Sequence, residues 1–207
     1  MGQWKKRFQA SIAGAASLCL LLVGLNHSGG YLQSQAATLT YETVHTISDF
    51  SSTTYLGMTN ATLDTELYRS APSSMKFAVP EGSSGVIWRT TYPEPIDLSD
   101  GGKYTLEDLG LAFWIYMDTT ETNYVYMFQL DSAGSWSKTV LWNKWRNTLT
   151  TATGQWAYVV LPLRDATNNG FDITSFRGFR VTQMGSDKPA HTFHIDDLQV
   201  VNLNASS

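Results

Sequence analysis

The sequence predicts an all-β fold, an antiparallel β-sandwich, and three observations lead to this interpretation. From residue 38 onward no segment keeps its apolar residues at the 3.6-residue period of an amphipathic helix. Short segments instead alternate in polarity or are dense in β-branched and aromatic residues. Turn-forming stretches separate these segments, and no crossover helices are expected. Antiparallel pairing in a sandwich or barrel follows, and we favour one sandwich domain.

The individual strands follow from local patterns. Met75, Phe77 and Val79 share one face of a segment that ends at the turn-forming residues 80–84. Residues 111–117 carry apolar or aromatic side chains on both faces. The expected strands are 43–47, 74–79, 85–90, 111–117, 124–130, 139–142, 156–161, 178–182 and 192–201.

Three further segments carry specific expectations. Residues 106–109 favour one short helical turn, and residues 49–68, rich in Ser and Thr, favour a surface connection with an irregular edge strand. Residues 156–161 are not polar on either face, which predicts a central strand covered on both sides and ended by Pro162.

The first 36 residues have the three parts of a secretory signal peptide. Residues 4–8 contain three basic residues, residues 10–25 form an apolar run of 16 residues, and Ser34 and Ala36 suit a cleavage site. The run is shorter than the ~20 residues of a spanning helix. An uncleaved signal anchor is the alternative, because the cleavage site lies far from the run. We predict a signal peptide at 1–36 and a domain at 37–207.

Net charge and cysteine content limit the ligands and the stabilising bonds that we expect for the domain. The chain has 14 Lys and Arg against 18 Asp and Glu, a formal net charge of −4 that argues against nucleic-acid binding. Cleavage after Ala36 removes three cations and no acid, which leaves a charge of −7. It also removes Cys19, the one cysteine, so no disulfide stabilises the domain. We expect a secreted, extracellular monomer of bacterial type that leaves the membrane once the signal is cleaved.

The order of several motifs resembles a known family. The sequence resembles the galactose-binding-like jelly rolls of secreted carbohydrate-binding modules over roughly residues 49–202. The motifs that carry the resemblance are PIDLS at 95–99, LGLAFWIY at 109–116, GQWAYVVLPL at 154–163 and FHIDDL at 193–198. The resemblance implies a jelly-roll β-sandwich and a polysaccharide or oligosaccharide partner, although this sandwich also serves other functions.

The same resemblance implies a structural calcium ion. Related modules hold calcium between an acid near the start of the domain and an acid in the closing motif. Asp196 matches the closing acid, and Asp49 lies where the early acid falls. The family commonly has Glu after the aromatic that follows, where this chain has Ser51, so the match is partial. Two solvated carboxylates are the alternative to a calcium site.

Candidate sugar-binding residues are those whose chemistry suits a saccharide. Sugar rings stack on Trp and Tyr, and sugar hydroxyls exchange hydrogen bonds with Arg and Gln. The candidates lie on strand positions opposite the most apolar neighbours, or in strand ends that lead into loops. They are Arg89, Trp114, Tyr116, Tyr126, Gln129, Trp142, Trp145 and Arg180. Any one aromatic is more often core, and Trp136 and Trp145 have the most polar surroundings.

Three classes of function remain open. The first is a non-catalytic carbohydrate-binding module. The second is a small polysaccharide lyase or glycoside hydrolase, for which Arg89, Tyr126, Gln129 and His194 would supply a lyase site, although the paired lyase motifs are absent. The third is a surface or matrix interaction protein. The charge of −7 disfavours an anionic polymer unless Arg89, Arg146 and Arg180 cluster.

Overall fold

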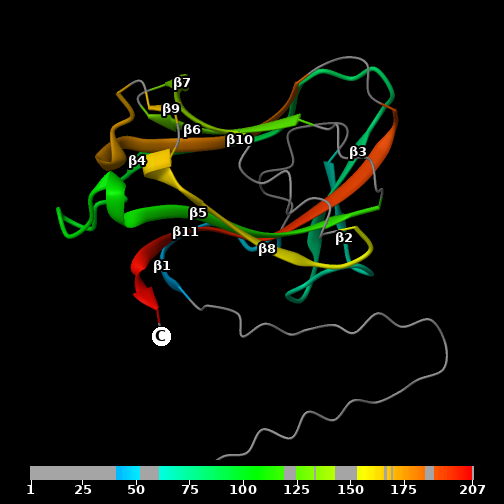
Figure 1. The fold of residues 1–207 in the computed structure, drawn as a ribbon, viewed down its shortest axis with the longest axis horizontal. Coiled ribbons are helices and arrows are strands. Elements are labelled where there is room, and N and C mark those ends of the chain that lie inside the picture. The colour runs from blue at the N-terminus through cyan, green and yellow to red at the C-terminus, as the bar shows by residue number, and fades with distance from the viewer. Residues whose placement is uncertain are drawn as a thin grey trace, which may run out of the picture. The chain divides into compact units, whose positions relative to one another are not determined.

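The computed structural model describes residues 41–51, 61–118, 125–132, 134–142, 153–165, 167–168, 170–184 and 189–206. The predicted signal peptide, Trp145 and Arg146 lie outside these residues. Two antiparallel sheets face one another, as Figure 1 shows, so the predicted β-sandwich is confirmed. In the ranges described, no helix is long and apolar enough to cross a membrane.

The lower layer in Figure 1 is a six-stranded sheet with β11 at its centre. Its order is β2-β3-β11-β5-β8, and β1 also pairs with β11. The first part of β11 pairs with β3 and the later part with β1, while β5 runs along its other side. The strands are β1 (Tyr41–Ser48), β2 (Ala61–Asp64), β3 (Ser74–Val79), β5 (Leu109–Met117), β8 (Ala157–Pro162) and β11 (His191–Ser206).

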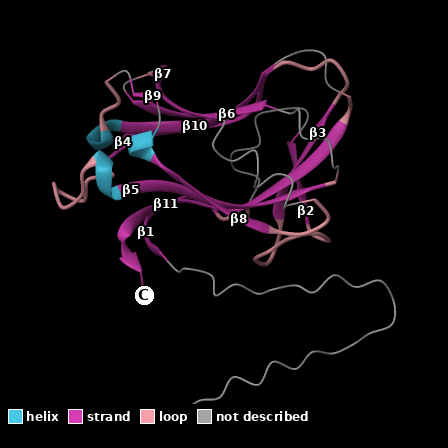
Figure 2. Cartoon of the chain, in the orientation of Figure 1, coloured by secondary structure: helices cyan, strands magenta, loops and turns pink. Residues whose placement is uncertain are grey.

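The upper layer is a five-stranded sheet with the order β4-β10-β6-β7-β9. Its strands are β4 (Gly85–Ile96), β6 (Val125–Ser132), β7 (Ser135–Trp142), β9 (Thr167–Asn168) and β10 (Phe176–Met184). Short 3-10 turns lie at one end of the sandwich, coloured cyan in Figure 2. They are η1 (Leu106–Asp108), η2 (Leu163–Asp165) and η3 (Ile173–Ser175).

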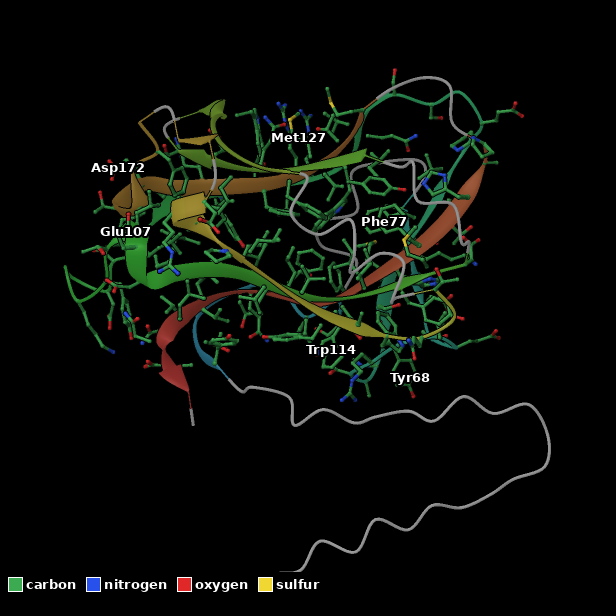
Figure 3. The ribbon with its side chains drawn as sticks, viewed as in Figure 1. Tyr68, Phe77, Glu107, Trp114, Met127 and Asp172 are labelled. Carbon is green, nitrogen blue, oxygen red and sulfur yellow. The ribbon has the colours of Figure 1, made fainter. Side chains whose placement is uncertain are left out.

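Aromatic side chains fill the space between the sheets. Phe113 of β5 and Phe128 of β6 lie 4.9 Å apart between ring centroids, so this pair joins the two layers. Trp88 is fully buried, and its ring centroid lies 6.0 Å from that of Phe77 and 5.7 Å from that of Phe179. Phe77 lies between the layers in Figure 3. Every second residue of these strands therefore points inward, and its neighbours point to an outer face.

Most expected elements are present, with one error. The helical turn occurs as η1, and the irregular edge strand occurs as β2. The prediction of a central strand at residues 156–161 is wrong, because β8 ends the order of described strands in its sheet. Its outer side chains are apolar for another reason: Tyr158 packs on Trp114 of β5, with ring centroids 5.0 Å apart.

The aromatic contact between the sheets gives a stability prediction. Replacing Phe128 by Ala removes a fully buried ring and leaves a cavity against Phe113 and Phe179. We expect a loss of about 3–5 kcal/mol in the free energy of unfolding, measured by urea denaturation. Met127→Ala, one residue earlier and on the outer face, is the matched control and should cost under about 1 kcal/mol. Equal losses would contradict this assignment of inner and outer faces.

Candidate functional site

The structure divides the predicted ligand-binding residues among three places. Figure 3 shows Trp114 on the outer face of the six-stranded sheet and Met127 on the opposite side of the molecule. Trp114 and Tyr116 lie on the outer face of the six-stranded sheet, and Arg89, Gln129 and Arg180 lie on the outer face of the five-stranded sheet. Tyr126 is buried between the sheets. The side chain of Trp142, at the end of β7, and all of Trp145 lie outside the described residues.

Polar side chains form a row across the outer face of the five-stranded sheet. Arg180 of β10 lies directly opposite Arg89 of β4 on one side and Gln129 of β6 on the other. Directly opposed residues of neighbouring strands point to the same face. Arg89 is exposed, Arg180 is half-buried and Gln129 is buried. We call Arg89, Gln129, Arg180 and the adjacent Trp136 the arginine face.

Gln129 fixes the geometry of the arginine face. Its amide nitrogen donates to the backbone carbonyl of Trp136 at 2.7 Å. Its amide oxygen accepts from Nε of Arg180 at 2.6 Å and from the hydroxyl of Thr182 at 3.4 Å. A buried amide with partners at both ends keeps one orientation. Arg180 is therefore held in place through Nε, while its terminal nitrogens are not used in these bonds.

Trp136 lies beside Arg180 and over the backbone of β10. The guanidinium carbon of Arg180 is 4.9 Å from the centre of the indole ring, a cation–π contact. A Cβ on Gly178 would lie 3.0 Å from Cη2 of Trp136 and only 2.5 Å from the carbonyl oxygen of Thr90. Glycine is thus required where the ring crosses the strand. Gly178 is the sequence signal for this contact, because a glycine inside a strand often marks close approach.

Positive charge gathers on the arginine face. Burial lowers the pKa of Arg180; the charge of Asp131 opposes this effect, and the neighbouring Arg89 adds to it. Within the described part of the chain, neither arginine forms an ion pair with a carboxylate. The sequence leaves open whether Arg89, Arg146 and Arg180 cluster. Arg89 and Arg180 are adjacent in the structure, and Arg146 lies outside the described residues.

The outer face of the six-stranded sheet differs, because its aromatic rings contact the protein itself. The guanidinium carbon of Arg69 lies 4.6 Å from the centre of the Trp114 ring. Tyr158 packs on Trp114, and the rings of Tyr116 and Trp156 lie 5.8 Å apart. Part of the Trp114 surface that would stack on a sugar is covered by Arg69.

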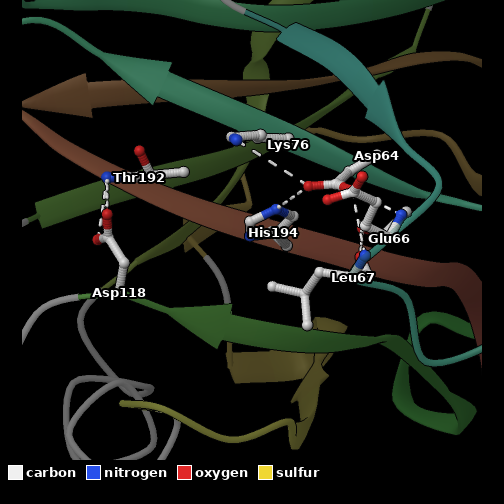
Figure 4. A network of polar contacts seen from close by, with 8 residues as sticks. Asp64, Glu66, Leu67, Lys76, Asp118, Thr192 and His194 are labelled. Carbon is white, nitrogen blue, oxygen red and sulfur yellow. Dashed lines mark hydrogen bonds and ion pairs between the residues drawn. The ribbon is translucent and has the colours of Figure 1, made fainter.

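Two carboxylates hold the segment 65–70 on this second face. Figure 4 shows Asp64 accepting from the backbone amides of Glu66 and Leu67 at 2.8 and 3.1 Å. Its other oxygen lies 3.0 Å from Nε2 of His194 and 4.0 Å from the ammonium of Lys76. Asp196 accepts from the amides of Arg69 and Ser70, both at 2.8 Å. These bonds position Arg69 over Trp114.

The predicted calcium residues have protein partners. Asp196 is fully buried, and besides Arg69 and Ser70 it accepts from the amide of Asp197 at 2.8 Å. Asp49 is exposed and accepts from the amide and hydroxyl of Ser51. Amide hydrogens would compete with a cation for the oxygens of Asp196. No group of three or more His, Cys, Asp or Glu residues suited to a metal ion occurs among the residues described. Calcium binding by Asp49 and Asp196 therefore stays a prediction.

The structure does not assemble the residues of the lyase alternative. Arg89 and Gln129 lie on the arginine face, whereas His194 lies on the outer face of the other sheet. The hydroxyl of Tyr126 is buried between the sheets, where it contacts Nε2 of His191. A base and its charge-neutralising partners must meet around one substrate, and these four residues do not meet.

Comparison with known proteins shows the fold. No protein-family model and no curated protein matches the sequence. A family 30 carbohydrate-binding module from a cellulosomal cellulase of Clostridium thermocellum has a similar structure, with a TM-score of 0.52 and 21% identity. The match covers 70% of this chain and 84% of that module. A second structure of a family 30 module also gives a TM-score of 0.52 at 21% identity, over 72% of this chain and 76% of the other. The chain shares the β-sandwich fold of these modules.

His194, which is buried at the outer face of the six-stranded sheet, predicts that the folded protein loses stability in acid. Burial lowers the pKa of His194 below its usual 6.5, against the opposing effect of Asp64. In the neutral ring Nε2 donates to Asp64, and Nδ1 is buried with no hydrogen-bond partner among the described residues. Protonation would bury an unpaired donor. The unfolded chain therefore takes up this proton more readily, so stability is complete above pH 6.5 and is lost as the pH falls below it.

Chemical denaturation between pH 7.5 and 5 measures this loss. His194→Gln keeps a donor toward Asp64 but does not titrate, so its stability should fall less over this range. His45 and His191, whose pKa values burial also lowers, should keep part of the slope in the variant. A variant as acid-sensitive as the wild type would contradict the assignment to His194.

Chelation tests calcium separately. Calcium bound by Asp49 and Asp196 would join distant parts of the chain, so EDTA should then lower the thermal unfolding midpoint and added calcium should restore it. An unchanged midpoint after EDTA treatment would show that calcium does not stabilise this domain.

Proposed function

We propose that this chain is a non-catalytic carbohydrate-binding β-sandwich that binds a polysaccharide on the arginine face. The observation that carries the proposal is the row of Arg89, Arg180 and Gln129 beside Trp136, in which neither arginine forms an ion pair with a described carboxylate. Hydrogen-bond donors held at an aromatic ring suit a ligand that offers hydroxyl groups and apolar C–H faces together.

Preorganisation favours this face for binding. The side chain of Arg180 is held by Gln129 and Trp136 before any ligand arrives, so binding costs less side-chain entropy. Arg89 is exposed and brings its complete set of N–H donors. On the opposite face, the carboxylates of Asp64 and Asp196 accept hydrogen bonds from groups of the protein, which leaves fewer acceptors for a ligand.

The shared fold gives independent support. The similar structures are described as carbohydrate-binding modules, one of them from a cellulosomal cellulase. At 21% identity this likeness concerns the fold, so the ligand is argued from the arginine face. We further propose that the protein acts as a secreted monomer, which the signal-peptide pattern of residues 1–36 supports.

Catalysis is tested with the same polysaccharides. A hydrolase would release new reducing ends, and a lyase would release unsaturated products that absorb in the ultraviolet. The proposal expects binding without either product over prolonged incubation. Product formation that requires Arg89 would replace this proposal with the enzyme alternative.

Removing the aromatic ring of the arginine face should weaken binding. Trp136→Ala is expected to lower affinity for the bound polysaccharide by about tenfold or more, because aromatic anchors dominate interface energies. Affinity electrophoresis with a panel of soluble neutral and acidic polysaccharides identifies the ligand, and calorimetry measures its affinity. Trp114→Ala removes the same side chain from the opposite face and should bind normally.

Circular dichroism and thermal unfolding show whether each variant is folded. Normal binding by Trp136→Ala together with weak binding by Trp114→Ala would move the site to the other sheet. The absence of binding to every polysaccharide in the panel would overturn the proposed function.

A further inference from the structure

The two arginines of the arginine face repel one another. Arg89 and Arg180 are directly opposed on β4 and β10. Like charges directly opposite each other across two strands destabilise a sheet. The contribution of Arg89 to lowering the pKa of Arg180 is the electrostatic sign of this repulsion. An anion between the two side chains would turn this unfavourable pair into a favourable one.

Neither arginine forms an ion pair with a carboxylate of the described residues. The hydrogen bond of Arg180 goes to the neutral amide of Gln129 and its ring contact to Trp136. The charge of Asp131 on β6 acts on Arg180 and opposes the effect of burial. The two described lysines that form ion pairs are Lys76, 4.0 Å from Asp64, and Lys103, 3.5 Å from Glu42. Arg164 and Arg177 instead donate to backbone carbonyls.

We propose that the polysaccharide bound on the arginine face is acidic, and that Arg89 and Arg180 bind its carboxylate or sulfate group. This inference rests on the proposed function. Guanidinium groups present paired N–H donors that match the oxygens of such anions. Arg180 offers its terminal nitrogens, since Nε is used by Gln129, and Arg89 offers its whole guanidinium. The part of the Trp136 ring that Arg180 and the backbone of β10 leave uncovered contacts the sugar ring beside the anionic group.

The acidic net charge of the domain does not prevent this binding. A formal charge of −7 repels a polyanion at long range, but charges separated by more than about 8–10 Å are largely screened at physiological ionic strength. At the arginine face two cations lie opposite each other, and the buried carboxylate of Asp131 offsets part of the charge of Arg180. Long-range repulsion should make association slow at low salt, whereas the local pair sets the dissociation rate.

A matched pair of ligands tests the inference directly. Polygalacturonate and alginate carry carboxylates, carrageenan carries sulfates, and polygalacturonate with its carboxyl groups reduced to alcohols is the neutral counterpart of the same backbone. Calorimetry with the full chain should show at least about tenfold weaker binding to the reduced polymer than to polygalacturonate. Preference for carrageenan over both carboxylate polymers would identify sulfate as the anion.

A variant with a matched control assigns the effect to the arginines. Arg89→Gln should lower affinity for the acidic polymer by about tenfold and affinity for the reduced polymer by clearly less, because only the acidic polymer loses a charge-assisted hydrogen bond. Arg164→Gln makes the same change at an exposed position in η2 and should bind like the wild type. Arg89→Lys keeps the charge without the paired donors and should bind with intermediate affinity.

The outcomes separate this inference from the proposed function. If neutral polymers bind as well as acidic ones, and Trp136→Ala still weakens that binding, the proposed function stands and the acidic ligand is refuted. Equal effects of Arg89→Gln on charged and reduced polymers would refute it as well. If no polymer binds, the proposed function and the acidic ligand are both refuted.

Discussion

The packing of two aromatic inner faces is the constraint on which the rest of this structure depends. Phe113 and Phe128 meet between the sheets, and Trp88 is enclosed between Phe77 and Phe179. Because side chains alternate along a strand, each inward ring fixes its neighbours on an outer face. The two outer faces point in opposite directions, so residues that share a pattern in the sequence need not share a surface.

This division gives the two outer faces different chemistry. On the six-stranded sheet, carboxylates bind backbone amides and a histidine, and Arg69 covers Trp114. The polar groups there stabilise the fold. On the five-stranded sheet, Gln129 orients Arg180 beside Trp136, and Arg89 stands opposite without a described partner. The opposed like charges of Arg89 and Arg180 are unfavourable to one another, and a bound anion would relieve this repulsion, which is why we assign binding to this face.

Much of the fold follows from local pattern, whereas the site does not. The alternation of Met75, Phe77 and Val79 predicts β3 with its observed bounds, since period two needs no knowledge of distant residues. The position of β8 at the end of its sheet was missed, because Tyr158 gains its cover from Trp114 on another strand. Arg89, Gln129 and Arg180 were each predicted for the site. Their separation from Trp114 and the burial of Tyr126 depend on which sheet each strand joins, a property of the whole chain.

The central claim is that a polysaccharide binds the arginine face. NMR titration of the labelled protein with an oligosaccharide of the bound polymer tests it most directly, by following the indole N–H signals and the arginine Nε–H signals. We expect large shifts in the side-chain N–H signals of Trp136, Arg89 and Arg180, and little change in those of Trp114 and Trp156. Shifts confined to Trp114, Trp156 and Arg69 would contradict it and place the ligand on the opposite sheet.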